Sequence, residues 1–178
     1  MAERSDAARN RATIIEAARE VIAEPGELKL SVVARRAGVG QGTLYRHFAS
    51  REELIRALYD HEIDDLVALA YSLLDQLTPD LALQQWFAQL AEYARIKRGV
   101  IAAVEASVWG DISAQTPGKL SKALSALLEA GRAQALIRDD VDSRDVILLS
   151  WFLAHVEDHE WADRTPRLLA VLLDGLRR

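Results

Sequence analysis

The sequence predicts an all-α fold of about nine helices, with a three-helix N-terminal part and a larger helical C-terminal part. Apolar residues recur three and four positions apart over most of the 178 residues, which places them on one face of a helix. Three Thr-Pro pairs, at 78–79, 116–117 and 165–166, are typical of helix starts, because threonine caps a first turn and proline at the first position loses no hydrogen bond. No stretch of useful length alternates apolar with polar residues, so no strand is expected.

Four helices are expected in the first 77 residues. Apolar stripes predict one helix over 13–24, a short one over 30–37 and a third that starts near Gln41, with Glu24-Pro25-Gly26 and Gly38 as the breaks between them. Ser50 and Glu53 have the spacing of a capping box, in which each side chain accepts a hydrogen bond from the other residue's backbone N–H. This box is expected to start a long fourth helix that reaches about Leu77.

The other helices are predicted after residue 78. The first Thr-Pro pair starts one of them, and Lys97-Arg98-Gly99 is expected to separate it from the next. Ser143 is predicted to cap a helix that runs to about His159, and Thr165-Pro166 to start the last one.

The composition excludes several classes of protein. Because the chain has no cysteine, it forms no disulfide, carries no thiol nucleophile and holds no zinc through cysteine. Residues 1–11 are polar with no apolar run behind them, unlike a secretory signal, and the longest uncharged stretches, such as 146–156, have eleven residues. A membrane span needs about 18, so we expect a soluble, cytoplasmic protein.

The net charge of −5 argues against a nucleic-acid partner when it is taken as an average. The distribution of charge argues the opposite. Residues 28–51 hold five of the 22 basic side chains and none of the 27 acidic ones, which leaves the rest of the chain at −10. A local basic surface is what contact with DNA phosphates requires, although a solvated helix face has the same composition.

The same basic segment has the form of a helix-turn-helix. Two short amphipathic helices are joined by a turn at Gly38, and small Ala34 and Ala37 let them cross closely. The second helix would then enter the major groove with its first residues leading. Glutamine suits an adenine edge, arginine a guanine, and threonine a thymine methyl or a phosphate, while Gly42 leaves room for the backbone to approach DNA. Tyr45 and His47 are expected to contact phosphate.

The block from Ala37 to Phe48, AGVGQGTLYRHF, with SREEL at 50–54, resembles the DNA-binding signature of TetR-family transcriptional regulators. The resemblance covers about the first 60 residues. It implies a dimeric repressor of a palindromic operator that a small molecule in the C-terminal domain releases. It also implies a helix-turn-helix domain over 1–50, with the start of the fourth helix to about 60, and an effector-binding and dimerisation domain over 51–178.

By position, the resemblance makes Gln41, Thr43, Tyr45 and His47 contacts of the recognition helix and Arg51 a phosphate ligand. Two positions depart from the family pattern. Gly40 stands where serine or threonine is usual, so the helix cap is weaker, and Lys29 stands where a hydroxyl is common, so a lysine would contact the phosphate instead. The predicted DNA-binding residues are Lys29, Gln41, Gly42, Thr43, Tyr45, Arg46, His47 and Arg51. Arg9 and Arg11 either contact the DNA backbone or minor groove or lie in a disordered tail.

The C-terminal part contains aromatic residues that either line an effector pocket or are ordinary core. A flat hydrophobic or weakly cationic compound would suit such walls. The candidate pocket residues are Trp86, Leu90, Tyr93, Val104, Glu105, Trp109, Trp151 and His155.

The last two helices are apolar almost all round, which indicates either a partner surface or two internal helices. In the family that the sequence resembles, these helices commonly form the dimer interface. The candidate interface residues are Leu149, Phe152, Leu153, Leu168, Leu172 and Leu176.

Two other functions compete with a ligand-responsive repressor. An all-α enzyme would need a phosphate loop, a nucleophile elbow or a metal set, and the nearest remnant is the pair His155 and His159, spaced four apart without the H-E-x-x-H pattern. A helical adaptor would explain the apolar helices but not residues 28–51. We therefore expect a DNA-binding regulator with no catalytic activity, no metal and no cofactor, whose partners are double-stranded DNA, a second copy of itself and an unidentified small molecule.

Overall fold

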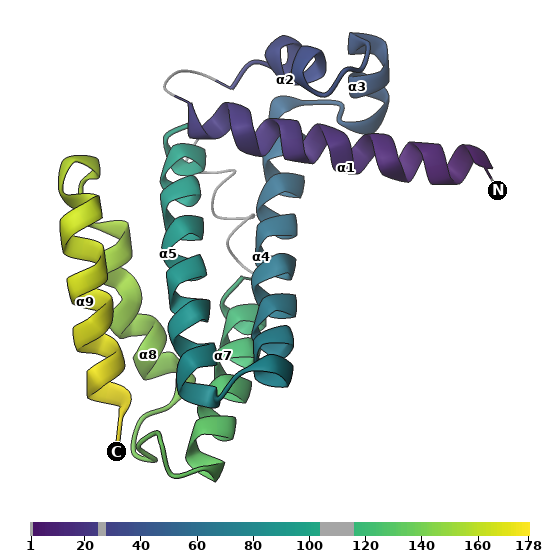
Figure 1. Cartoon of the computed structure of the whole chain (residues 1–178). Helices are drawn as coiled ribbons and strands as arrows, with labels where there is room; N and C mark the ends of the chain where they lie inside the picture. Colours follow the sequence, from purple (N-terminus) through teal and green to yellow (C-terminus); the bar gives the residue numbers. More distant parts are fainter. Residues whose placement is uncertain (1, 25–27, 104–115) are drawn as a thin grey trace. The chain divides into compact units, whose positions relative to one another are not determined.

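The computed structural model describes residues 2–24, 28–103 and 116–178, with the side chains of 6–24, 28–94 and 118–178. In this part of the chain there are eight α-helices and two short 3₁₀ segments, and no strand, so the predicted all-α class is confirmed (Figure 1). The helices are α1 (Ala2–Ala23), α2 (Leu30–Arg36), α3 (Gln41–His47), α4 (Arg51–Gln76), α5 (Pro79–Ala103), α7 (Thr116–Ala133), α8 (Ser143–Leu149) and α9 (Trp161–Leu176), and the 3₁₀ segments are η1 (Ser150–Ala154) and η2 (Asp158–Glu160).

These helices form two compact units. The first unit contains α1, α2, α3, the start of α4 and the end of α5, and the second contains the rest of α4 and α5 with α7, α8 and α9. The division falls between His61 and Glu62, inside α4. A division of functions at residue 50 stays a prediction.

The core of the first unit is small and aliphatic apart from Phe48. α1 contributes Ile14 and Ala18, α2 contributes Val33, and α3 contributes Leu44; all four are almost completely buried. The predicted break at Gly38 is confirmed: its φ of +66° is a left-handed conformation that glycine adopts without steric cost.

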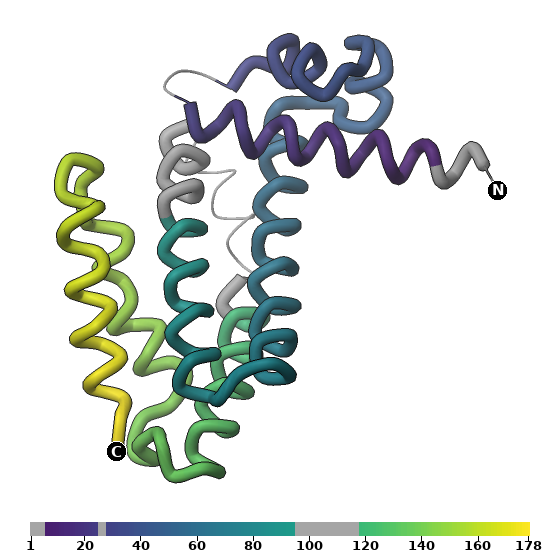
Figure 2. Tube along the Cα trace, in the orientation of Figure 1, coloured from purple at the N-terminus to yellow at the C-terminus, as the bar shows by residue number. Residues whose placement is uncertain are grey.

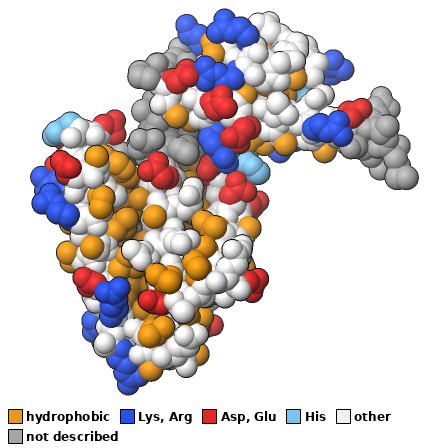
Figure 3. All heavy atoms as spheres, in the orientation of Figure 1, with side chains coloured by type: hydrophobic (Ala, Val, Ile, Leu, Met, Phe, Trp, Pro, Cys, Tyr) orange, Lys and Arg blue, Asp and Glu red, His pale blue; other side chains and the backbone are white. Residues whose placement is uncertain are grey.

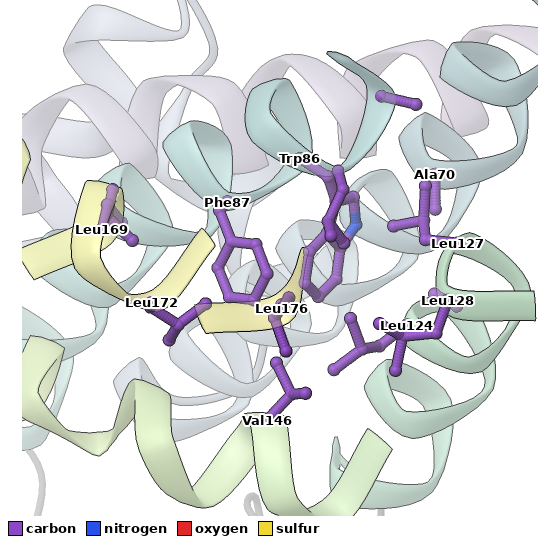
Figure 4. Packing of buried hydrophobic residues seen from close by; sticks show 14 of the residues in the cluster. Ala70, Trp86, Phe87, Leu124, Leu127, Leu128, Val146, Leu169, Leu172 and Leu176 are labelled. Carbon is purple, nitrogen blue, oxygen red and sulfur yellow. The ribbon is translucent and has the colours of Figure 1, made fainter. Parts of the chain in front are cut away.

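The second unit is built around aromatic residues. α4 and α5 run in opposite directions on either side of a short turn (Figure 2). Buried Trp86 of α5 donates its indole N–H to the carbonyl of Leu66 in α4 at 2.9 Å. Its ring meets Phe87 edge-on, with centroids 5.4 Å apart, and side chains from α7, α8 and α9 surround the pair (Figure 4).

A short link between α9 and the segment after α7 completes the second unit. The backbone N–H of Arg138 donates to Leu176 at 2.9 Å, and that of Arg178 donates to Leu136 at 3.1 Å. Gly131 allows this approach, because a Cβ there would overlap the side chain of Ile137. The link closes α9 onto the unit with two backbone hydrogen bonds and no sheet.

Several predicted helix boundaries are wrong. α1 starts at Ala2 and not near 13, and α5 runs through Lys97-Arg98-Gly99 to Ala103. Residues 1–13 lack an apolar stripe, but their alanine, arginine and glutamate are strong helix formers, which was the available signal.

The last helices differ from expectation as well. α9 starts at Trp161, so Pro166 lies inside it, whereas the other two Thr-Pro pairs do mark helix starts. α8 is capped by Asp142, which exchanges 2.9 Å hydrogen bonds with Asp145, and not by Ser143. It ends at Leu149, and η1 and η2 replace the predicted continuation to His159.

Candidate nucleic-acid interface

α3 presents a polar face on the side opposite its buried residue. Leu44 is 1% exposed and anchors the helix in the core of the first unit. At 3.6 residues per turn, Arg46 lies almost opposite Leu44. Gln41, Gly42, Tyr45 and Arg46 are exposed, while Thr43 and His47 are half-buried on one flank.

The start of α3 has no side-chain cap. Gly40 is extended, with φ −68° and ψ 150°, and only its carbonyl contributes, accepting from the N–H groups of Thr43 and Leu44 at 2.9 and 3.0 Å. This weaker cap agrees with the departure seen in the sequence. The helix is therefore held mainly by the packing of Leu44 and Phe48.

Arg46 does not extend freely from the helix. Its Nε donates to the carbonyl of Gly42 at 3.2 Å, and its Nη2 donates to Oγ1 of Thr43 at 3.2 Å. Both partners lie earlier in α3, so the guanidinium is folded back toward the start of the helix.

The first turns of α1 lie beside this flank of α3. A hollow of about 430 Å³ is lined by Asp6, Ala7, Asn10, Thr43, Arg46 and His47. Asp6 pairs with Arg9 of its own helix at 3.1 Å, and Arg11 lies over the ring of Phe48 at 5.1 Å from its centroid. Arg9 and Arg11 thus belong to α1 and not to a disordered tail, and their contact with DNA stays a prediction.

One basic side chain of residues 28–51 is already paired with acidic residues. Arg36 contacts Glu24, just after α1, at 2.7 Å and Glu20 of α1 at 3.7 Å, and the hydrogen bond that its guanidinium donates to Glu24 raises the pKa of the guanidinium. The net charge of residues 28–51 does not include these two acids, because they precede the segment in the sequence. Lys29 remains exposed at the start of α2.

The predicted capping box at α4 is confirmed in one half. Ser50 Oγ accepts from the N–H of Glu53 at 3.2 Å, as expected. The carboxylate of Glu53 accepts from the N–H of Ala49 at 2.8 Å, one residue before the predicted donor. The pKa of Glu52 is lowered by its own backbone N–H and by the Ser50 hydroxyl. These bonds fix the first turn of α4, where Arg51 is half-buried.

The described residues among the predicted pocket residues differ in exposure, and that they line one effector cavity stays a prediction. Trp86, Tyr93 and partly buried Leu90 are packed inside the second unit, whereas Trp151 and His155 are exposed. Val104, Glu105 and Trp109 lie outside the described residues. A hollow of about 170 Å³ occurs elsewhere in this unit, lined by Asp80, Leu83, Gln84, Ile137, Ala170, Leu173, Asp174 and Arg177.

The predicted interface residues fall into two groups. Leu149 is 59% exposed and Phe152 and Leu168 are half-buried, but Leu153, Leu172 and Leu176 belong to the core of their own unit. The sequence missed three strongly exposed apolar side chains on the same elements, Leu148, Trp151 and Val171. The orientation of Trp151 depends on where α8 ends, which the periodicity of a uniformly apolar segment does not indicate.

The described residues include no cluster of three or more histidine, aspartate or glutamate side chains placed to hold a metal ion. His155, the residue after η1, bonds to the carbonyl of Trp151 at 3.0 Å, and His159 of η2 contacts Glu157 at 3.2 Å. The helical face that would have aligned these two histidines is therefore not formed. Within the same described ranges, no helix has the length and apolar character to cross a bilayer.

Comparisons with known proteins agree with this geometry. Residues 14–58 match the family of bacterial regulatory proteins named tetR, and residues 78–178 match the C-terminal domain of SbtR-like transcriptional regulators. The crystal structure of the TetR transcriptional regulator SCO0520 from Streptomyces coelicolor is 35% identical, with a TM-score of 0.84 over 94% of this chain and 98% of that one.

Two further relatives have a lower sequence identity or match over a shorter stretch of the chain. The probable transcriptional regulator ArpR from Pseudomonas putida is 37% identical over 103 residues, 53% of this chain and 49% of that protein, so the chain spans about half the length of the curated relatives it matches. A γ-butyrolactone receptor, described as ArpA-like, is 26% identical with a TM-score of 0.63 over 97% of this chain and 90% of that one. With both of its domains matched, the chain belongs to the TetR family of bacterial transcriptional regulators.

Proposed function

We propose that the protein regulates transcription by binding double-stranded DNA as a dimer on a palindromic operator. One observation carries this proposal: α3 is packed through Leu44 and presents Gln41, Tyr45 and Arg46 to solvent. A recognition helix needs this arrangement to enter a major groove with its polar side chains leading.

The proposal gives the surface residues two different roles. Gln41 and Arg46 contact base edges, because an amide pairs with adenine and a guanidinium with guanine. Lys29, Tyr45, His47 and Arg51 contact phosphate, which positions the helix without selecting sequence. Gly42 leaves the backbone of α3 uncovered, since a Cβ there would meet nothing within 4 Å.

Binding to DNA tests the proposal directly. Fluorescence anisotropy would use the DNA upstream of the protein's own gene, with salt varied from 50 to about 200 mM. Arg46→Ala should change the preference among bases, and Tyr45→Phe should weaken all sequences alike. Arg167→Ala, at an exposed arginine of α9, is the matched control and should change neither. Failure of the wild type to bind any palindromic upstream DNA at low salt would refute the proposal.

The dimer is proposed to form through the exposed apolar side chains of α8, η1 and α9. Leu148, Leu149, Trp151 and Val171 are 45–71% exposed, although large apolar side chains on neighbouring elements are normally covered. Figure 3 shows hydrophobic side chains on the surface of this unit. A second copy supplies an identical surface to cover them.

Sedimentation at micromolar concentration tests this interface. The wild type should sediment as a dimer and the double variant Leu149→Asp, Trp151→Asp as a monomer. Leu81→Asp, at a 45% exposed leucine of α5, is the matched control and should leave the dimer intact. A wild-type monomer would refute the dimer, and with it simultaneous binding to two half-sites.

We further propose that the protein is a repressor that a small molecule in the second unit releases. The γ-butyrolactone receptor of the same fold supports a small-molecule effector by its name. A ligand lowers the affinity for DNA only by stabilising a conformation that binds DNA less well. The first probes are a γ-butyrolactone and a flat aromatic compound, and an effector should raise Tm and release bound DNA. A probe that raises Tm without releasing DNA is a ligand but not an inducer.

A further inference from the structure

Thr43 occupies an unusual place for a residue that contacts a base. It is half-buried on the flank of α3 beside the first turns of α1, whereas Gln41, Tyr45 and Arg46 are exposed. Its hydroxyl oxygen accepts a hydrogen bond from Nη2 of Arg46 at 3.2 Å. The Thr43 hydroxyl therefore already has a partner within α3 before any DNA is present.

The second hydrogen bond of Arg46 also holds its guanidinium toward the start of α3. Nε donates to the carbonyl of Gly42 at 3.2 Å, so two sides of the guanidinium are attached to the residues three and four positions earlier. Side chains on a helix point toward its N-terminus, which is the end that leads into the groove. A guanidinium has five N–H donors, and these two bonds leave three for a DNA base.

We propose that Thr43 is a positioning residue: its hydroxyl holds the guanidinium of Arg46 at the leading end of α3, and Thr43 itself contacts no base. The inference rests on the DNA-binding function proposed above. An unrestrained arginine loses much side-chain freedom when it binds, and an arginine already held in place loses less. Base selection by Arg46 then depends on the residue at position 43.

Among the described side chains, no neighbouring charge is paired with this arginine. Asp6 lines the same hollow, but its carboxylate is paired with Arg9 at 3.1 Å. His47, also on the hollow, has no acceptor group at hydrogen-bonding distance from Arg46. Thr43 is thus the side chain of α3 that determines where the Nη2 group points.

A double-mutant cycle tests the proposal on DNA. Relative affinities are measured for a set of half-sites that each change one base pair, using Thr43→Val, Thr43→Ser, Arg46→Ala and the double variant Thr43→Val, Arg46→Ala. Valine keeps the β-branched shape and removes the acceptor, and serine keeps the acceptor. Thr43→Val should reduce the preference at the base pair that Arg46 selects by about two- to tenfold, the range of one hydrogen bond. Thr43→Ser should retain it, and Thr43→Val should have no further effect when Arg46 is already alanine.

Three results would overturn the proposal. Thr43→Val could reduce the preference at a different base pair, which would make Thr43 a base contact. It could weaken all sequences equally, which would make it a phosphate contact, or its effect could persist when Arg46 is alanine. Circular dichroism and Tm confirm that each variant is folded.

A measurement without DNA separates this inference from the function on which it rests. In ¹⁵N NMR spectra of the free protein, rotation about the Nε–Cζ bond of Arg46 should be hindered in the wild type and in Thr43→Ser, and free in Thr43→Val. Equal rotation in all three proteins would refute the positioning role even if the wild type binds DNA. A protein that fails to bind DNA yet shows the expected difference would refute the proposed function alone.

Discussion

Three helices of equal length show how differently the two units stabilise short segments. α2 and α3 in the first unit and α8 in the second each have seven residues. α8 begins with a complete capping box from Asp142 and Asp145, whereas the positions before α2 and α3, Lys29 and Gly40, provide no side-chain cap. Helices this short are unstable alone, so α2 and α3 depend on packing.

The cores differ in the same way. Among the described side chains, the apolar cluster of the first unit has Phe48 as its one aromatic, with buried Tyr59 outside it, while that of the second contains Trp86, Phe87 and Trp161. In the first unit the side chains facing away from the core are the ones proposed to bind DNA. The comparison indicates that function in the first unit depends on a few packed residues that hold an otherwise poorly capped helix.

The largest effect is expected in the aromatic core. Trp86→Ala should lower the free energy of unfolding by about 3–5 kcal/mol, because it leaves a cavity and removes the hydrogen bond to Leu66. Denaturant unfolding measures the loss. Trp86→Phe keeps one six-membered ring but removes the five-membered ring of the indole with its N–H, so it leaves a smaller cavity and should cost less than Trp86→Ala; equal losses would mean that the hydrogen bond and not the packing dominates.

Leu44→Ala should cost about 2–5 kcal/mol and release α3 from the first unit. Leu124→Ala in the second unit is the matched control, since both leucines are 1% exposed. Amide exchange should show that protection of residues 41–47 is lost in the first variant and kept in the control. If residues 41–47 kept their protection in Leu44→Ala, α3 would be stable without its anchor, and its dependence on packing would be refuted.

Asp142→Ala should have a smaller effect than Leu44→Ala, and the effect should depend on pH. The backbone N–H of Asp145 lowers the pKa of Asp142, so the folded state binds fewer protons than the unfolded state as the pH falls below the ordinary value for aspartate. The contribution is complete above that value, about 4, and is lost as the pH drops through the lowered pKa. Tm curves of wild type and variant should therefore differ at pH 7 and converge in acid; a constant gap would contradict this account.

The smallest effect is expected from supplying α3 with the cap it lacks. Gly40→Ser should stabilise the protein by about a few tenths of a kcal/mol, because the backbone is already extended and a Cβ would meet nothing within 4 Å. A small rise in Tm measures it. Gly40→Ala, which adds a Cβ without a hydroxyl, should lack the gain from capping.

The helix boundaries of the first unit were easier to predict than those of the second, because the residues that determine them lie close to each boundary in the sequence. Gly38, the Leu44–Phe48 spacing and Ser50 each act within a few residues, and the breaks between α2, α3 and α4 follow from them. What the sequence missed there depends on contacts between helices, such as Arg36 with Glu24 or the turns of α1 beside Thr43.

The helix boundaries of the second unit were harder to predict, because a uniformly apolar segment does not indicate which of its residues face the core. Residues 146–153 do not indicate where α8 gives way to η1, and this change decides that Leu149 is exposed and Leu153 buried. Thr165-Pro166 looks like the other two helix starts, but α9 begins four residues earlier at Trp161, which is buried. Tertiary packing overrides the local signal in both cases.

The link between Leu136 and Arg178 has a consequence for biosynthesis. A chain leaves the ribosome from its N-terminus, and every described residue of the first core lies between Ile14 and Leu58. That core can close while translation continues. The second cannot: Leu176 is part of it, and the hydrogen bonds between the backbones of Arg138 and Leu176 and of Arg178 and Leu136 need the last turn of α9. The apolar faces of α5 and α7 therefore stay partly uncovered until Leu176 is made, about 40 residues after the end of α7 and about 70 after the end of α5.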